Sequence, residues 1–206
     1  MCSSDLADLN AHDASIALLE RAQRWAEMVT ALRRAAEAKG DRGRELRVRA
    51  ARVLEAELHD TDAAIDEWIE IEEYDGADEE TIDALVALLS GAGRWIDLVS
   101  VLERGLEETL DSTRRIDFME RLGDVYRERT SAPERALMCY RDVLAEVPEH
   151  AGARVGMTAL LEVAACKPAA VALLLQAFET TGDWAGRLSL LEHRLDVAIL
   201  RISPRM

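Results

Sequence analysis

Residues 116–149, IDFMERLGDVYRERTSAPERALMCYRDVLAEVPE, decide the fold because they contain two helical patterns separated by one turn. The tetrapeptide Ser131-Ala132-Pro133-Glu134 has the order of a capping box, with proline in the first turn of the helix that follows. Pro148 comes just after that helix, in a position where helical structure ends. The stretch therefore predicts an antiparallel hairpin with helices over 112–129 and 133–146.

Two short patterns recur along the chain and extend this hairpin into a repeat. In the first, a tryptophan is followed by apolar residues on one stripe of a helix, as in Trp25-Val29-Leu32, Trp95-Val99-Leu102 and Trp184-Leu188-Leu191. The second occurs as Ala64-Trp68-Ile71 and again as Ala136-Tyr140-Val143. Gly93 and Gly182 precede two copies of the first pattern, where the preceding helix needs a left-handed cap. Alternation of two patterns at intervals of about 35 residues is typical of stacked helix pairs.

Composition and pattern together predict an all-α protein without a sheet. Glycine (11) and proline (4) are scarce, and long alternating β-branched runs are absent. The expected helices are 8–22, 24–39, 42–58, 61–74, 78–91, 94–109, 112–129, 133–146, 150–165, 168–180 and 184–199. The expected N-caps are Thr61, Asp78 and Ser112. Because Lys167-Pro168 divides 150–181 into two helices, the fold prediction is about five antiparallel helix pairs plus one extra helix.

The residues of 116–149 also carry a family resemblance. The spacing of Leu122-Gly123, Tyr126, Ala136, Tyr140, Val143 and Pro148 resembles the signature of the tetratricopeptide repeat (TPR), and 44–77 resembles it more loosely. The resemblance implies a right-handed α-α superhelix in which small residues such as Gly123 and Ala136 let paired helices approach. It also implies that the first helix of each pair lines a concave groove and that the protein binds other proteins.

The predicted organisation is a single TPR-like domain over 7–200. We expect residues 1–6 to be a non-native or disordered segment, because Cys2-Ser3-Ser4-Asp5-Leu6 matches the translated end of a common sequencing adapter. We expect residues 201–206 to be a frayed or truncated C-terminus of a fragment of a longer repeat array.

Charge restricts the class of partner. The formal net charge is −15, and an acidic surface repels phosphate backbones, which excludes nucleic acid as the main ligand. Another protein or a peptide segment, basic in character, is the expected partner. No membrane association is expected, because the longest apolar stretch, 157–178, contains charged residues and a proline.

Residue usage indicates the cellular setting. The three cysteines, Cys2, Cys139 and Cys166, have neither the spacing of a disulfide framework nor that of a zinc site, so a reducing cytoplasm is expected. Arginine far outnumbers lysine, a bias typical of GC-rich bacterial genes.

The sequence predicts no catalytic residues, no cofactor and no metal site. Its histidines form no HExxH motif, and neither a GxSxG motif nor a Gly-rich phosphate loop occurs, so an enzyme built on a helical toroid has no supporting residue set. Glu55 and His59 lie four positions apart on one expected helix, which indicates an exposed pair rather than a metal site. The four tryptophans, Cys139 and Cys166 are expected to be core residues.

The charges are strongly segregated along the chain. Residues 21–52 contain ten basic and four acidic side chains, whereas 53–93 contain fourteen acidic side chains and no lysine or arginine. Either the arginines of 42–58 pair with acidic neighbours, or the acidic block is a docking face. Under the second hypothesis an acidic concave groove accepts a basic or amphipathic segment. Carried over from the TPR resemblance, its lining is Val48, Arg52, Glu80, Asp83, Asp117, Glu120, Asp124 and Arg127.

A structural self-association module is the alternative function. The expected helix 184–199 retains Leu188, Leu190, Leu191, Leu195 and Ile199, an apolar load that suits stacking on further repeats or on another copy.

Overall fold

The computed structural model describes residues 3–38, 42–76, 78–191 and 193–195, with side chains described from His12 onward except for Ala38. Throughout these ranges the regular secondary structure is helical, and no β-strand occurs. The molecule divides into two compact units, Met1–Arg94 and Trp95–Met206. The single domain expected over 7–200, with separate segments at 1–6 and 201–206, remains a prediction.

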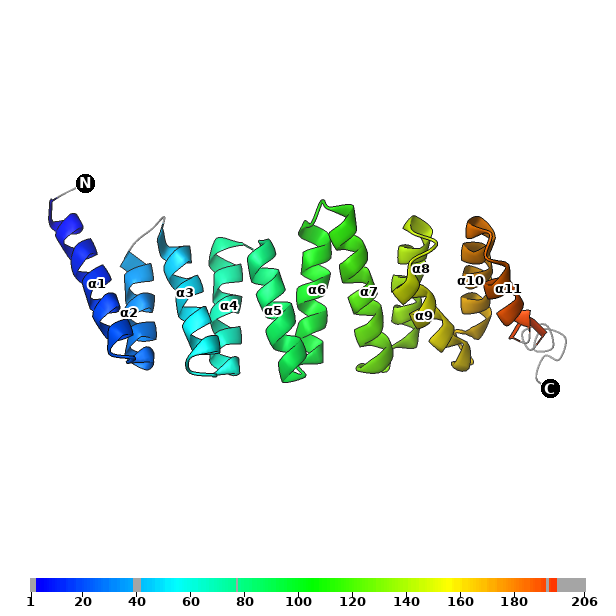
Figure 1. Cartoon of the computed structure of the whole chain (residues 1–206), viewed down its shortest axis with the longest axis horizontal. Coiled ribbons are helices and arrows are strands. Elements are labelled where there is room, and N and C mark those ends of the chain that lie inside the picture. The colour runs from blue at the N-terminus through cyan, green and yellow to red at the C-terminus, as the bar shows by residue number, and fades with distance from the viewer. Residues whose placement is uncertain (1–2, 39–41, 77, 192, 196–206) are drawn as a thin grey trace. The chain divides into compact units, whose positions relative to one another are not determined.

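The first unit is a series of antiparallel helices, each packed on the next (Figure 1). Its helices are α1 (Ser3–Arg21), α2 (Trp25–Ala38), α3 (Gly43–Ala56), α4 (Thr61–Asp75) and α5 (Glu79–Ala92). Alanines at the contacts, among them Ala35, Ala50 and Ala64, are fully buried, so the helix axes approach closely.

The second unit continues the same arrangement and adds a helix. It contains α6 (Trp95–Glu108), α7 (Ser112–Glu128), α8 (Pro133–Glu146), α9 (Ala151–Ala159), the 3₁₀ helix η2 (Leu160–Glu162), α10 (Lys167–Thr181) and α11 (Trp184–Ser189). Helix α9 contacts α7, α8 and α10 and is the extra helix expected within 150–181. The described residues therefore confirm an all-α protein of packed helices with the expected number of α-helices.

Most helix boundaries agree with the predictions, and the differences have local causes. Helix α1 begins at Ser3, before the expected residue 8. Helix α11 ends at Ser189, where a turn buries Leu190, and 193–195 are helical again; the expected end at 199 lies outside the described residues.

Aspartates rather than hydroxyl residues start several helices. The side chains of Asp60, Asp78 and Asp111 accept hydrogen bonds from backbone N–H groups in the first turns of α4, α5 and α7. Asp78 was predicted correctly, whereas Thr61 and Ser112 were wrong by one position, because in each case the carboxylate just before them caps the helix.

The predicted capping box at Ser131–Glu134 is also wrong. Ala132 is the N-cap of α8 and makes no side-chain capping bond, while Ser131 occupies the left-handed region at φ 51°. Pro133 does start α8 as expected, because its fixed φ already suits a helix. Gly93 and Gly182 are left-handed C-caps, at φ 70° and 69°, as predicted.

Tyr140 organises the core of the second unit. Its side chain is fully buried and lies against two glycines, Gly123 of α7 and Gly156 of α9. A Cβ atom added at these positions would lie 2.6 Å and 2.3 Å from atoms of the Tyr140 ring. The expectation that Gly123 lets helices approach is therefore confirmed, and Gly156 serves the same purpose for the extra helix.

Helix α9 is shorter than the expected 150–165. After Ala159 the backbone tightens into η2, and both Leu160 and Leu161 are buried. The chain then leaves the helical conformation at Val163, whose backbone is extended at φ −94° and ψ 109°.

The tryptophans are not equally buried, which corrects the prediction that all four are core residues. Trp68 is 1% exposed, Trp25 and Trp95 are partly buried, and Trp184 is 74% exposed. Among the described elements α11 packs mainly on α10, and the contact that the Trp184 ring makes is with the Arg187 guanidinium of its own helix, 4.8 Å from the ring centroid. Cys139 is also only partly buried, whereas Cys166 is buried as expected.

A methyl group at Gly156 tests the close packing on Tyr140. We expect Gly156→Ala to lower the free energy of unfolding by about 1–3 kcal/mol, because the ring cannot move without displacing a packed helix. Urea denaturation followed by circular dichroism measures the change. Gly91→Ala is the matched control, because no atom lies within 4 Å of its added Cβ and the helix gains propensity. Equal losses in both variants would contradict the packing explanation.

Candidate functional site

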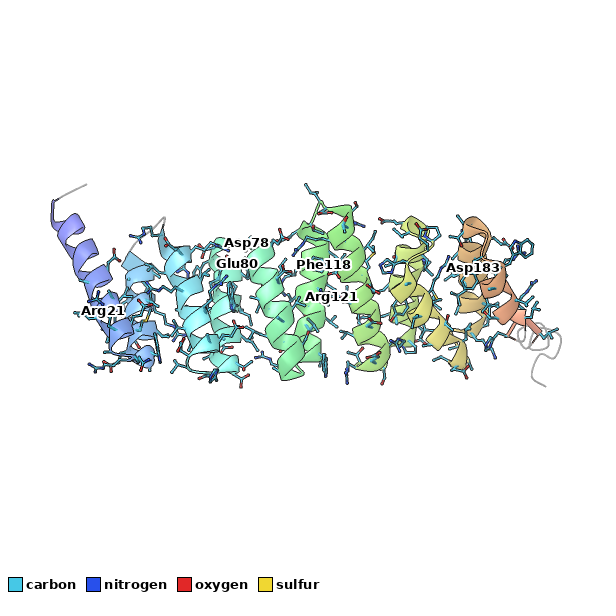
Figure 2. All side chains as sticks on the ribbon, in the orientation of Figure 1. Arg21, Asp78, Glu80, Phe118, Arg121 and Asp183 are labelled. Atoms are coloured by element: carbon cyan, nitrogen blue, oxygen red, sulfur yellow. The ribbon has the colours of Figure 1, made fainter. Side chains whose placement is uncertain are left out.

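The arginines of α3 pair with the acidic residues that follow them in the chain. Arg44 contacts Asp78 and also lies 3.3 Å from Glu80 (Nη2 to Oε2), and Arg52 donates to the other Glu80 oxygen at 2.5 Å. Arg47 lies 3.1 Å from Asp75. Figure 2 shows Asp78 and Glu80 at the start of α5. The internal pairing considered as one explanation of the charge segregation is therefore present in the first unit.

Ionisation of Asp78 is favoured by its contacts. Burial opposes the charged form, but hydrogen bonds from the Thr81 hydroxyl and backbone and from Arg44 outweigh it and hold the pKa of Asp78 below its ordinary value. The carboxylate thus caps α5 and binds the arginine of α3 at the same time.

The groove residues expected in the first unit have different environments. Val48 is buried and contributes to the core. Arg52 and Glu80 bind each other, while Asp83 lies exposed on α5. In this unit, therefore, the charged side chains rather than Val48 can contact a ligand directly.

The groove residues expected in the second unit lie along α7. Asp117 pairs with Arg121 one turn later, at 3.0 Å. The carboxylate of Glu120 lies over Gly152, where a Cβ would come within 1.5 Å of Oε1, and that oxygen is 3.8 Å from His150 Nδ1. Glu120 therefore fits against the start of α9 and is only partly exposed.

Asp124 and Arg127 are bound to the core tyrosine. The Tyr140 hydroxyl donates to Asp124 Oδ1 at 2.7 Å and accepts from Arg127 Nε at 3.2 Å. Burial raises the pKa of Tyr140, and its hydrogen bond to Asp124 raises it further. The sequence placed Asp124 and Arg127 in the groove but did not predict that they bind Tyr140. The available signal was the hydroxyl of Tyr140, at a repeat position where the other copy has Trp68.

A second charged site, which the sequence analysis did not identify, lies between α2 and α4. It is a pocket of about 690 Å³ lined by Arg33, Ala36, Glu37, Arg47, Asp66, Glu67, Glu70 and Tyr74. Glu67 is only 1% exposed and accepts a hydrogen bond from Arg33 Nε at 2.6 Å. Burial raises the pKa of Glu67, although the bond from Arg33 acts in the opposite direction. Its position between Ala64 and Ile71 on the core stripe was the signal that could have revealed it.

The described residues contain no group of His, Cys, Asp and Glu side chains that could hold a metal ion. Helix α3 ends at Ala56, so Glu55 and His59 do not lie on the same helix, contrary to expectation. His59 lies at φ 52°, with Nδ1 3.3 Å from the Glu55 carbonyl oxygen.

Burial raises the pKa of Cys139 to about 11 and also raises the pKa of Cys166, which keeps both thiols protonated near neutral pH. No helix in the described ranges has the length and apolar character needed to cross a bilayer.

Comparison with known proteins bears on the fold. No family model and no curated protein matches the sequence. Two crystal structures of MamA are similar, with TM-scores of 0.52 and 0.53 at 16% and 14% identity; the matches cover 81% and 87% of this chain and 94% of each MamA chain. A tetratricopeptide repeat protein from Parabacteroides merdae ATCC 43184 matches with a TM-score of 0.53 at 10% identity, over 96% of this chain and 80% of that one. The fold is TPR-like. Identities this low establish the TPR-like architecture alone.

Replacement of Asp78 tests the charge pairing of the first TPR-like unit. We expect Asp78→Ala to lower the free energy of unfolding by about 1–2 kcal/mol at neutral pH, because α5 loses its N-cap and Arg44 loses a partner. Since the pKa of Asp78 is lowered on folding, this stabilisation is present above the ordinary aspartate pKa and is lost as pH falls through the lowered pKa. Urea unfolding at neutral and acidic pH measures the difference.

Asp78→Asn is the control, because an asparagine still caps a helix but carries no charge. It should retain most of the stability at neutral pH. A difference between the wild type and Asp78→Ala that stays constant into acid would contradict the role of the ionised carboxylate.

Proposed function

We propose that this chain is a non-catalytic interaction scaffold that binds a basic or amphipathic segment of another protein. The TPR-like fold supports a binding role, and one charge argument carries the proposal. The chain has 25 basic and 40 acidic residues, so a formal charge of −15 remains even if every basic side chain takes an acidic partner. The internal pairs of α3 therefore do not use up the acidic surface, and the excess attracts cationic segments.

The proposed contact surfaces are the acidic faces of the first helices of the pairs, one in each unit. In the first unit this face comprises Glu80 and Asp83 of α5, and in the second it comprises Asp117, Glu120 and Asp124 of α7. We expect Asp83 and Asp117 to contact the ligand directly, because Asp83 is exposed on α5 and Asp117 leaves 47% of its side chain exposed beside Arg121. Glu80 and Glu120 leave only 39% and 25% exposed, and Asp124 is held by the Tyr140 hydroxyl. Residence in the cytoplasm remains part of this proposal.

Charge reversal of Asp83 and Asp117, one aspartate from each face, tests the proposal. Asp83→Lys combined with Asp117→Lys should weaken binding of a lysine-rich amphipathic peptide by about tenfold or more, because two attractive contacts become repulsive. Isothermal titration calorimetry on the full chain measures Kd, and binding of the wild type should weaken as salt rises.

The matched control is Glu107→Lys with Glu146→Lys, which makes the same charge change at exposed positions of α6 and α8, the second helices of their pairs. Its effect should be small. Equal weakening in both double variants would show that binding depends only on net charge, and it would contradict the assignment of the contact to these two faces. Affinity capture with the full chain, followed by mass spectrometry, would then identify the natural partner.

Self-association is the second candidate, and one observation favours it. Trp184, Leu188, Leu191 and Leu195 are all largely exposed, although their spacing places apolar residues on one helical face. Of the other residues in the expected apolar load, Leu190 is buried and Ile199 lies outside the described residues.

Sedimentation velocity tests this alternative. If the exposed apolar face pairs with another copy, the wild type should dimerise with rising concentration, and Leu188→Glu with Leu195→Glu should shift it to a monomer. Leu18→Glu, at an exposed leucine of α1, is the control and should not change the distribution. A wild type that stays monomeric over the whole range would rule out self-association through this face.

A further inference from the structure

Glu67, which lines the pocket between α2 and α4, has one carboxylate oxygen without a hydrogen-bond partner. Arg33 occupies Oε2 of Glu67, with Nε and Nη2 at 2.6 Å and 2.5 Å. Oε1 of the same carboxylate is buried and accepts no hydrogen bond from any described residue. A buried acceptor left unpaired carries a free-energy cost, which is larger when the group is charged. A donor supplied from outside the chain would remove this cost.

The charges around the pocket select the kind of donor. Four carboxylates line it (Glu37, Asp66, Glu67 and Glu70), against two guanidinium groups, those of Arg33 and Arg47. Both guanidinium groups are already engaged, Arg33 by Glu67 and Arg47 by Asp75 and by the Tyr74 ring, whose centroid is 5.4 Å away. The lining therefore has an excess of negative charge and favours a cationic donor.

The geometry of Glu67 further restricts the cation. A guanidinium binds a carboxylate best through both oxygens at once, but Arg33 already holds Oε2. An ammonium is a compact charge with three donors, so it can bond the single unpaired oxygen and still reach neighbouring carboxylates. The exposed ring of Tyr74 offers an apolar surface for a methylene stem at the pocket edge.

We propose that the pocket between α2 and α4 binds a primary alkylammonium group, with its nitrogen donating to Glu67 Oε1 and to the carboxylate of Glu70. The group can come from a lysine side chain of a protein partner or from a free polyamine. This site is separate from the acidic faces of α5 and α7, and either proposal can fail without the other.

Titration of the full chain with spermidine and with a short lysine-containing peptide tests the site. We expect saturable shifts in ¹H–¹⁵N spectra confined to residues around the pocket, including the indole signal of the neighbouring Trp68 assigned through Trp68→Phe. Glu67→Gln should weaken binding by about tenfold, because it removes one charged hydrogen bond. Glu70→Gln gives a second, partly independent test at an exposed position and keeps the test decisive if Glu67→Gln does not fold.

Glu73→Gln is the matched control, because Glu73 lies exposed on the same helix but outside the pocket lining; its affinity should equal that of the wild type. Binding of spermidine alone would assign the site to a free polyamine, and binding of the peptide would assign it to a partner's lysine. Absence of saturation by either amine at about 10 mM would overturn the proposal and leave Oε1 to an ordered water. Equal binding by N-acetylated amines, tighter binding of an arginine peptide, or unchanged affinity in both glutamine variants would also overturn it.

Discussion

Close approach of neighbouring helices is the constraint on which this structure depends. In the second unit, Gly123 and Gly156 leave room for the ring of Tyr140, and any larger side chain would collide with it. In the first unit, buried alanines keep α2, α3 and α4 close together. Within each unit, buried aromatic rings and leucines pack beside these small residues and hold neighbouring helices close together. Stacked repeats gain their stability from such contacts between adjacent elements.

Ion pairs between neighbouring helices add to this packing. Helix α3 presents arginines to α1, α4 and α5, where they meet Glu20, Asp75 and Glu80. Each exposed pair contributes little stability by itself. Together they engage Glu20, Asp75 and Glu80 within the fold, whereas Asp83 remains exposed on the proposed face of α5. In the second unit the Asp124–Tyr140–Arg127 contacts connect the acidic surface of α7 directly to the core.

The sequence was sufficient to predict the helices, because the apolar stripes and the glycine caps are local signals. The extra helix at α9 also followed from spacing and from Lys167-Pro168. The errors arose where tertiary contacts decide. Trp184 has the same repeat position as partly buried Trp25, yet its exposure depends on what packs against α11. Likewise, the state of Glu67 depends on Arg33, a residue of another helix that no local pattern connects to it.

For the candidate binding faces, the sequence predicted which charged residues take part but not how deeply each is buried or which residues it contacts. Pattern and resemblance placed the eight residues on first helices, but they could not show that Val48 is buried or that Asp124 is bound to Tyr140. Such distinctions depend on the depth of each side chain and on its cross-helix partners, which emerge only when the helices are packed.

The aspartate N-caps have a consequence for anyone who engineers this protein. Asp60, Asp78, Asp111 and Asp183 begin four of its helices, and all belong to the same acidic population that gives the chain its low isoelectric point. Wholesale replacement of surface carboxylates by alanine or lysine, a common route to better crystals or weaker adsorption to resins, would therefore remove helix caps along with the surface charge. A mutagenesis library should leave these four aspartates unchanged and draw its substitutions from exposed glutamates away from helix starts, such as Glu73, Glu107 and Glu128.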